Sequence, residues 1–249
     1  MASLLQRYRA GEYEAVWAEV ASSGASALRE PMRTQALDLC REFVDRCYRN
    51  LTLLHSRLLD LGYEFEDPGR ALVTASAEDV RRRDACEQEL GEFPLVAHTW
   101  YSVMASVNFS QAPRQLGRWG GAPDFGANAI LGLGSHPVLI VQDLAMAREQ
   151  SVDYTSEEEG VFLPLGAWAS NCEPKGMELP GVGADFILFD DGGGPVTFVN
   201  EWRDAFEWGG FPFWAPFFGP TARRWSDSLG YKPDFARLLT ELKLGLDPL

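Results

Sequence analysis

The chain has 249 residues, a length that corresponds to between one and two domains of ordinary size. Hydrophobic residues make up 46% and charged residues 23%, which is enough apolar material for a large core and excludes wholesale disorder, collagen and a small disulfide-stapled scaffold. The 36 acidic residues outnumber the 22 basic ones, and the formal net charge of −14 repels phosphate backbones and anionic lipid. We therefore expect no general binding to nucleic acid or membrane surfaces, and a basic protein as the charged partner.

The first 105 or so residues have helical periodicity. Residues 2–21 hold apolar side chains at helical spacing, interrupted by Gly11. After Pro31 the apolar residues recur every three or four positions until Gly62, and they are Ala36, Cys40, Phe43, Cys47, Leu51, Leu54, Leu58 and Leu61. This pattern predicts one amphipathic helix over residues 31–61, with its apolar side in the core rather than on a partner.

Two more helices are predicted before the period changes. Ser76 with Asp79 three residues later is a capping signal for a helix that runs to Leu90, and Pro94 can open the next helix at its first turn. Residues 110–137 are rich in Gly, Pro, Ala and Asn, and we expect them to form a long loop that is functional or mobile.

Short strands are predicted in the second half of the chain. The apolar runs Val138–Val141 and Val161–Leu165 are the first two candidates. Phe186–Phe189 and Val196–Val199 flank a glycine-rich turn, which is typical of an antiparallel hairpin.

Helices are predicted again at about residues 201–208 and 234–244. The predicted order of elements is helices first, locally paired strands next and helices last. This order favours an α+β fold, in which a mostly antiparallel sheet packs against helices. No repeat or linker divides the sequence, so we expect a single domain over residues 1–249, with an N-terminal helical extension over 1–75 and an α+β core over 76–249.

The cysteines and the N-terminus indicate a soluble, cytoplasmic protein. The four cysteines form no Cys-x-x-Cys pair and have no His at zinc-ligand spacing, so we expect free, buried thiols in a reducing compartment. The first nine residues reach a charge before any apolar run, and no stretch approaches the ~18 apolar residues of a membrane span.

The sequence lacks recognisable catalytic motifs. His55, His98 and His136 are not surrounded by metal-spaced carboxylates, and Gly132-Leu133-Gly134 fails as a dinucleotide fingerprint because Pro137 occupies the third glycine position. We expect no catalytic residue, no metal and no cofactor. The alternative is a small-molecule enzyme that uses His98 or His136 in a cleft under the 110–137 loop.

Two acidic clusters and one aromatic stretch are the candidate binding surfaces. The clusters fall in loops beside predicted strands, where a rigid sheet could present them to a basic partner, although they could also be a solvated charge run and a plain hairpin turn. The aromatic stretch 208–218 either folds into the core or exposes two anchors. The candidate partner-binding residues are Glu157, Glu158, Glu159, Asp190, Asp191, Trp214 and Phe217.

Three segments together resemble the SUKH superfamily, named for its yeast cell-wall-synthesis regulators and bacterial immunity proteins. The first begins at Glu89–Pro94 and continues through Trp100-Tyr101 to Val107–Phe109. It is similar to the family opening, in which an acidic helix end and a Leu-Pro precede an aromatic helix and the first strand. Phe93 replaces the usual Leu, and Ala105-Ser106 stands where the family usually has Gly.

The other two segments extend the resemblance over roughly residues 85–215. Pro137–Val141 is similar to the Asp-Pro-Leu strand of large bacterial members, with His136 in place of Asp, and Phe198–Pro212 resembles the closing helix and Gly-Gly-Phe-Pro turn of bacterial relatives. The resemblance implies a distant, large bacterial member with a sheet backed by helices and no catalytic residues. It also implies an immunity-type protein that neutralises a toxin by occluding it. A regulatory scaffold with several partners is a further possibility, and the oligomeric state stays open.

Overall fold

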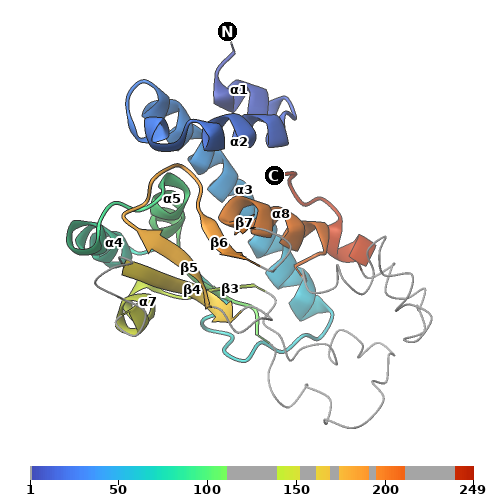
Figure 1. Cartoon of the computed structure of the whole chain (residues 1–249). Helices are drawn as coiled ribbons and strands as arrows, with labels where there is room; N and C mark the ends of the chain where they lie inside the picture. Colours follow the sequence, from blue (N-terminus) through green and yellow to red (C-terminus); the bar gives the residue numbers. More distant parts are fainter. Residues whose placement is uncertain (1, 111–138, 152–160, 169–173, 191–194, 211–238) are drawn as a thin grey trace.

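The computed structural model describes residues 2–110, 139–151, 161–168, 174–190, 195–210 and 239–249. Within these ranges the fold is α+β, as predicted: helices make up most of the first hundred residues, and three small antiparallel sheets lie against helices (Figure 1). The predicted loop 110–137 lies, apart from its first residue, outside the described residues.

The N-terminal helices follow the predicted pattern closely. They are α1 (Leu4–Arg9), α2 (Tyr13–Ser22), a short 3-10 helix (Gly24–Leu28) and α3 (Met32–Asp60). The apolar side of α3 is buried as expected, with Phe43, Leu51 and Leu54 fully inaccessible. Leu61 is the exception at 40% exposed, because the helix has already ended at Asp60.

The next two helices, α4 (Ala77–Leu90) and α5 (Leu95–Val103), also form where they were predicted. Ser76 and Asp79 cap α4 reciprocally, each side chain bonding the main-chain N–H of the other. Pro94 is the residue immediately before α5 rather than the first residue of its first turn. Helix α5 packs beside both α3 and α4, at the centre of the molecule.

The seven described strands pair with their neighbours in chain order. The sheets are β1-β2-β3 (Leu72–Thr74, Met104–Asn108, Ile140–Val141), β4-β5 (Val161–Trp168, Pro174–Leu179) and β6-β7 (Ile187–Asp190, Pro195–Thr197), all antiparallel. Gln142 N–H, just after β3, donates to the carbonyl of Leu165 on β4 at 2.8 Å, and β5 lies beside β6. The three sheets therefore follow one another in space as they do in sequence.

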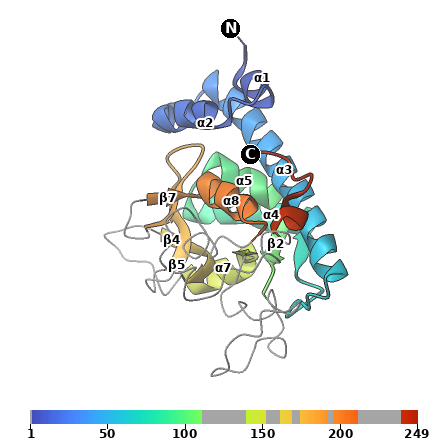
Figure 2. The same cartoon turned by 90° about the vertical axis from the view of Figure 1, so that its right-hand side faces the viewer.

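Two helices flank these sheets. Helix α7 (Leu144–Ser151) contacts β4 and α4, and α8 (Phe198–Glu207) contacts β6 and β7 (Figure 2). Residues 239–243 are helical, which agrees with the end of the helix predicted over 234–244; residues 234–238 lie outside the described residues.

Several element boundaries were predicted wrongly. The strand predicted over Val196–Val199 ends at Thr197, because the Thr197 hydroxyl accepts a hydrogen bond from the N–H of Asn200 and begins α8. Strand β5 was missed because Gly176 and Pro174 weaken its pattern. A Cβ at Gly176 would lie 2.4 Å from the Phe162 ring on β4, so the close approach of the two strands requires glycine.

One hydrophobic core joins the helical and sheet-bearing segments. Its buried residues come from α1 to α5 as well as from β2 to β6 and α8. At its centre the Trp100 ring of α5 meets Phe198 edge-on, with ring centroids 5.2 Å apart, and Trp202 at 4.6 Å. Residues 1–75 and 76–249 thus contribute to the same core.

Candidate functional site

Most of the predicted partner-binding residues lie outside the described part of the chain. This applies to Glu157, Glu158, Glu159, Asp191, Trp214 and Phe217, and to the alternative catalytic candidate His136. Asp190 is described only in its main chain, as the last residue of β6, opposite Pro195 of β7. The roles assigned to these residues stay predictions.

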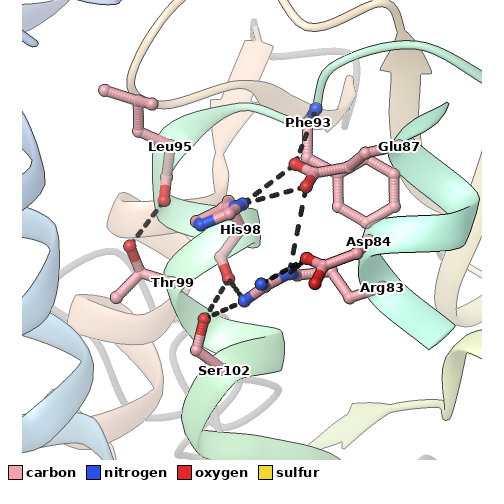
Figure 3. Close-up of polar contacts among 8 residues, drawn as sticks. All are labelled: Arg83, Asp84, Glu87, Phe93, Leu95, His98, Thr99 and Ser102. Carbon is pink, nitrogen blue, oxygen red and sulfur yellow. Dashed lines mark hydrogen bonds and ion pairs between the residues drawn. The ribbon is translucent and has the colours of Figure 1, made fainter. Parts of the chain in front are cut away.

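His98 belongs to a polar network between α4 and α5 (Figure 3). Its Nδ1 lies 3.0 Å from each carboxylate oxygen of Glu87, in the last turn of α4. Glu87 Oε1 also accepts a hydrogen bond from the main-chain N–H of Phe93, at 3.2 Å. Only four residues separate the two helices, so the end of α4 meets the start of α5, and one carboxylate bonds both the connection and the imidazole.

Arg83, one turn earlier on α4, completes the network from the buried side. Only 7% of its surface is exposed. Its Nη1 donates to the hydroxyl of Ser102 and, at 3.3 Å, to the carbonyl of His98. Its Nη2 donates to Asp84 Oδ1 at 2.5 Å, and the hydrogen bond from Arg83 lowers the pKa of the Asp84 carboxyl.

A carboxylate–imidazole pair is the arrangement that orients a histidine for proton transfer. Nucleophilic catalysis needs a hydroxyl or thiol on the other ring nitrogen as well. Ser102 Oγ instead donates to the carbonyl of His98 at 2.8 Å, and Thr99 Oγ1 donates to the carbonyl of Leu95 at 2.7 Å. In the described residues the network therefore joins two helices, and only the partly exposed His98 ring is left to exchange a proton with a ligand.

The other described histidine and the described cysteines are packing residues. The His55 ring stacks on Phe65 with centroids 4.7 Å apart, and burial lowers its pKa, which favours the neutral ring. Cys40, Cys47 and Cys86 are buried free thiols, as predicted, and burial raises the pKa of each. Cys172 lies outside the described residues. Among the described residues, no group of three His, Cys, Asp or Glu side chains is placed to bind a metal.

A second polar region, on α3, was not predicted from the sequence. Arg46 is 9% exposed and Asn50 2% exposed, and both bond the C-terminal segment 246–249. The Arg46 guanidinium also lies over the Tyr8 ring, 4.8 Å from its centroid, and donates to Glu42 at 2.9 Å. The only local signal is the spacing of Glu42, Arg46 and Asn50, which are four residues apart along one side of the helix.

Asp185 is a partly buried carboxylate just before β6, at the start of α8. Burial raises its pKa to about 6, although its Oδ1 accepts hydrogen bonds from the N–H groups of Phe186, at 2.9 Å, and Val199, at 3.3 Å. These bonds fix the start of α8 against the loop before β6.

Carboxylates of the same chain hold most of the basic residues in the described ranges. The paired residues are Arg7, Arg9, Arg41, Arg46, Arg49, Arg70, Arg81, Arg82, Arg83, Arg148, Lys175 and Lys243. Because acidic residues exceed basic ones by 14 in the whole chain, internal pairing leaves a surplus of carboxylates.

Comparison of the chain with family models, with curated proteins and with solved structures finds no match. None of the described helices has the length and apolar character needed to cross a bilayer. The fold and the two networks define a helix-rich α+β protein whose described polar clusters connect its own secondary-structure elements.

Proposed function

We propose that this chain is an immunity-type binding protein of the SUKH kind, which neutralises a bacterial toxin in the cytoplasm by occluding it. The observation that carries the proposal is the surplus of negative charge. The formal net charge is −14, and the basic side chains of the described residues are largely held by carboxylates of the same chain. The remaining carboxylates are available to a basic partner, and opposite charges accelerate its capture.

The segments that resemble the SUKH superfamily form secondary-structure elements whose order supports the same proposal. The segment around Glu89–Pro94 ends α4 and leads through α5 directly into β2. Residues 140–141 form β3, which pairs with β2, and the segment beginning at Phe198 forms α8. These are an aromatic helix, the strands after it and a closing helix, in the order that the resemblance leads one to expect.

Charge reversal tests the proposal on a partner recovered from the native host by pull-down and mass spectrometry. Changing Glu157, Glu158 and Glu159 together to Lys shifts the local charge by six units. If this run faces the partner, the association rate constant should fall by about one to three decades, the range seen among variants of one interface. The wild-type rate should also fall as salt shortens the screening length from ~10 Å at 0.1 M to ~3 Å at 1 M.

A matched control separates this run from overall charge. Asp45 and Asp60 on α3 and Glu149 on α7 are exposed, and changing them to Lys gives the same shift of six units without a cluster. This variant should associate at nearly the wild-type rate. Equal slowing of both variants, or an association rate indifferent to salt, would contradict electrostatic capture by the 157–159 run. Trp214 and Phe217 would then be the next residues to change.

The contact between Glu87 and His98 is the one observation that favours the alternative, a small-molecule enzyme. Under the binding proposal, His98→Ala and His136→Ala leave partner binding intact apart from any loss of stability. An activity lost in either variant at an unchanged melting temperature would favour the enzyme instead.

A further inference from the structure

Three side chains from three helices each keep a buried polar atom that has no hydrogen-bond partner among the described residues. The atoms are the hydroxyl of Tyr8 on α1, the indole Nε1 of Trp17 on α2 and Nη2 of Arg203 on α8. Tyr8 is 0% exposed and Trp17 4% exposed. Tyrosine and tryptophan usually find a partner for their polar atom when they are buried, because an unpaired buried donor costs free energy. All three atoms therefore lack an acceptor.

The three atoms are close to one another. Burial raises the pKa of the Tyr8 phenol, and both the charge of Arg203 and the N–H of Trp17 act in the opposite direction. Such effects weaken with distance, so both groups lie near the Tyr8 hydroxyl. The contact between Trp17 and Tyr8 does not have the geometry of a hydrogen bond, which leaves both polar atoms available to a third group.

Direct contacts independently bring Arg203 to the neighbourhood of Tyr8. The Arg46 guanidinium lies over the Tyr8 ring, 4.8 Å from its centroid, and its Nη1 donates to the carbonyl of Pro248 at 2.8 Å. The carbonyl of the next residue, Leu249, accepts a hydrogen bond from Arg203 Nε at 3.1 Å. The two arginines thus bond adjacent residues. The bond of Arg203 uses Nε, so Nη2 stays available whatever follows Leu249 in the chain.

The charge of Arg203 favours an anion as the missing acceptor. Apart from the bond of Nε, the guanidinium donates from Nη1 to the side-chain oxygen of Asn200 at 3.4 Å. Neither bond reaches a carboxylate side chain, whereas the neighbouring Arg46 is held by the Glu42 carboxylate at 2.9 Å. Burial lowers the pKa of Arg203, because a cation taken out of water is disfavoured without a counter-charge. An anion at Nη2 would supply that counter-charge.

The chemistry of the donors favours a small anion over a water molecule. Nη2 of Arg203 carries two N–H donors, Trp17 one N–H and Tyr8 one O–H. A water molecule would bring two hydrogens of its own, which need acceptors. A halide ion only accepts, and it accepts from any direction, so donors from three different helices can converge on it. Hydrogen bonds to an ion are also stronger than those between neutral groups.

We propose that Tyr8, Trp17 and Arg203 form a buried binding site for a small monovalent anion of the halide class, represented by chloride. Helices α1 and α2 pack near the start of α3, and α8 packs on β6 and β7 (Figures 1 and 2). An anion bound by all three side chains would therefore join the N-terminal helices to the part of the chain that carries the sheets. The site is separate from the acidic residues of the proposed function and does not depend on it.

Thermal unfolding of the full chain in chloride tests the proposal. Gluconate, which is too large for the site, is replaced stepwise by chloride at a fixed total salt concentration, so that screening of the net charge of −14 stays constant. A ligand that binds only the folded protein lowers the unfolding constant in proportion to its concentration once the site is saturated. Each tenfold rise in chloride should then raise the melting temperature by about 3–6 °C. A melting temperature indifferent to chloride would overturn the proposal.

Tyr8→Phe removes one donor and keeps the ring. Without chloride this variant should melt no lower than wild type, because the hydroxyl has no partner to lose among the described residues. Its chloride dependence should be weaker, with an affinity several-fold lower. Tyr101→Phe is the matched control, since the buried Tyr101 hydroxyl donates to the carbonyl of Gln142 at 3.0 Å. The control should melt lower than wild type at every chloride concentration and keep the full chloride dependence.

The two tyrosine variants separate the proposed site from a general salt effect. Equal chloride dependence in Tyr8→Phe and wild type would overturn the proposal, because the anion would then act elsewhere. If Tyr8→Phe does not fold, Trp17→Phe takes its place with the same expectation. The width of the chloride NMR signal provides a measurement on the unchanged protein: saturable broadening that bromide reverses supports the site, and its absence would overturn it.

Discussion

Arg46 on α3 and Arg83 on α4 are both buried, with 9% and 7% of their surfaces exposed, yet they connect very different stretches of the chain. Arg46 reaches the carbonyl of Pro248, 202 residues away, and lies over the ring of Tyr8. Among the described residues, the most distant partner of Arg83 along the chain is Ser102, 19 residues away. The first arginine holds together the two ends of the chain, and the second holds together two neighbouring helices.

The comparison separates contacts between distant parts of the chain from contacts within one pair of neighbouring helices. In the α3 region, made of α1 to α3 and residues 239–249, the bonds of Arg46 and Asn50 to the carbonyls of Pro248 and Asp247 exist only when these distant parts of the chain fold together. In the α4–α5 pair, the contacts close a short loop, and one of the acceptors, Asp84, is half exposed and can bond water instead. We therefore expect changes in the α3 region to affect global unfolding, and equivalent changes in the pair to cost less.

The largest effect is expected from Leu54→Ala in the middle of α3. Leu54 is fully buried, so its truncation should lower the free energy of unfolding by about 2–5 kcal/mol through lost burial and the cavity that remains. Denaturant unfolding measures it. A change below about 0.5 kcal/mol is typical of exposed positions and would mean that α3 does not contribute its apolar side to the core.

Arg46→Ala should have the next largest effect. It removes hydrogen bonds to Glu42 and to the carbonyl of Pro248, and the expected loss is about 2–3 kcal/mol, as for buried hydrogen bonds to a charged group. Deuterium uptake at residues 246–249 should rise in the same variant. Unfolding that weakens without any change in this uptake would contradict the long-range role of Arg46.

The pH dependence of stability gives a third comparison, through Asp185. The pKa of this carboxyl is about 6 in the folded state, against 3.8 for an unperturbed group, so between these values the folded state binds more protons than the unfolded state. The contribution of Asp185 to the free energy of unfolding should therefore rise as the pH falls from 7 toward 4. Burial causes the shift, and Arg203 partly opposes it.

Asp185→Asn isolates this contribution. The difference in the free energy of unfolding between wild type and variant should change by about 1–2 kcal/mol between pH 7 and pH 4. A pKa shift is worth ~1.4 kcal/mol per unit, and the expected change is smaller than the whole shift would give because Asp185 is partly exposed. The lowered pKa of Glu42 acts in the opposite direction at lower pH and cancels in the difference. Parallel curves for the two proteins would show that Asp185 titrates normally.

Arg83→Ala should have the smallest effect, about 1 kcal/mol, because the bonds it removes are local and Asp84 can be hydrated. The contact between His98 and Glu87 should survive in this variant, and the histidine resonances in NMR spectra would report it. A loss as large as that of Arg46→Ala would remove the distinction between the two regions.

The sequence predicted the elements whose signals are local and missed the contacts whose partners are distant. The period of α3, the Ser76 cap and the pairing of β6 with β7 are all encoded within a few residues, and each formed, although β7 ends two residues before the predicted strand does. Strand β5 depends on Gly176 fitting against Phe162, and the hydrogen bonds of Arg46 and Asn50 to residues 247–248 join positions about 200 residues apart. Neither leaves a periodic pattern. The pairing of His98 with Glu87 was not predicted either, because it requires the turn angle between α4 and α5.

The buried thiols allow the opening of α3 and the opening of α4 to be measured separately. Cys40 and Cys47 lie in α3 and Cys86 in α4, all free and inaccessible. An alkylating reagent reaches such a thiol only in the fraction of molecules whose helix has opened, and it reacts with the thiolate, which burial disfavours. The labelling rates of Cys40 and Cys47, separated from that of Cys86 by peptide mapping, would therefore time the opening of α3 and of α4 independently, in unmodified protein and without denaturant.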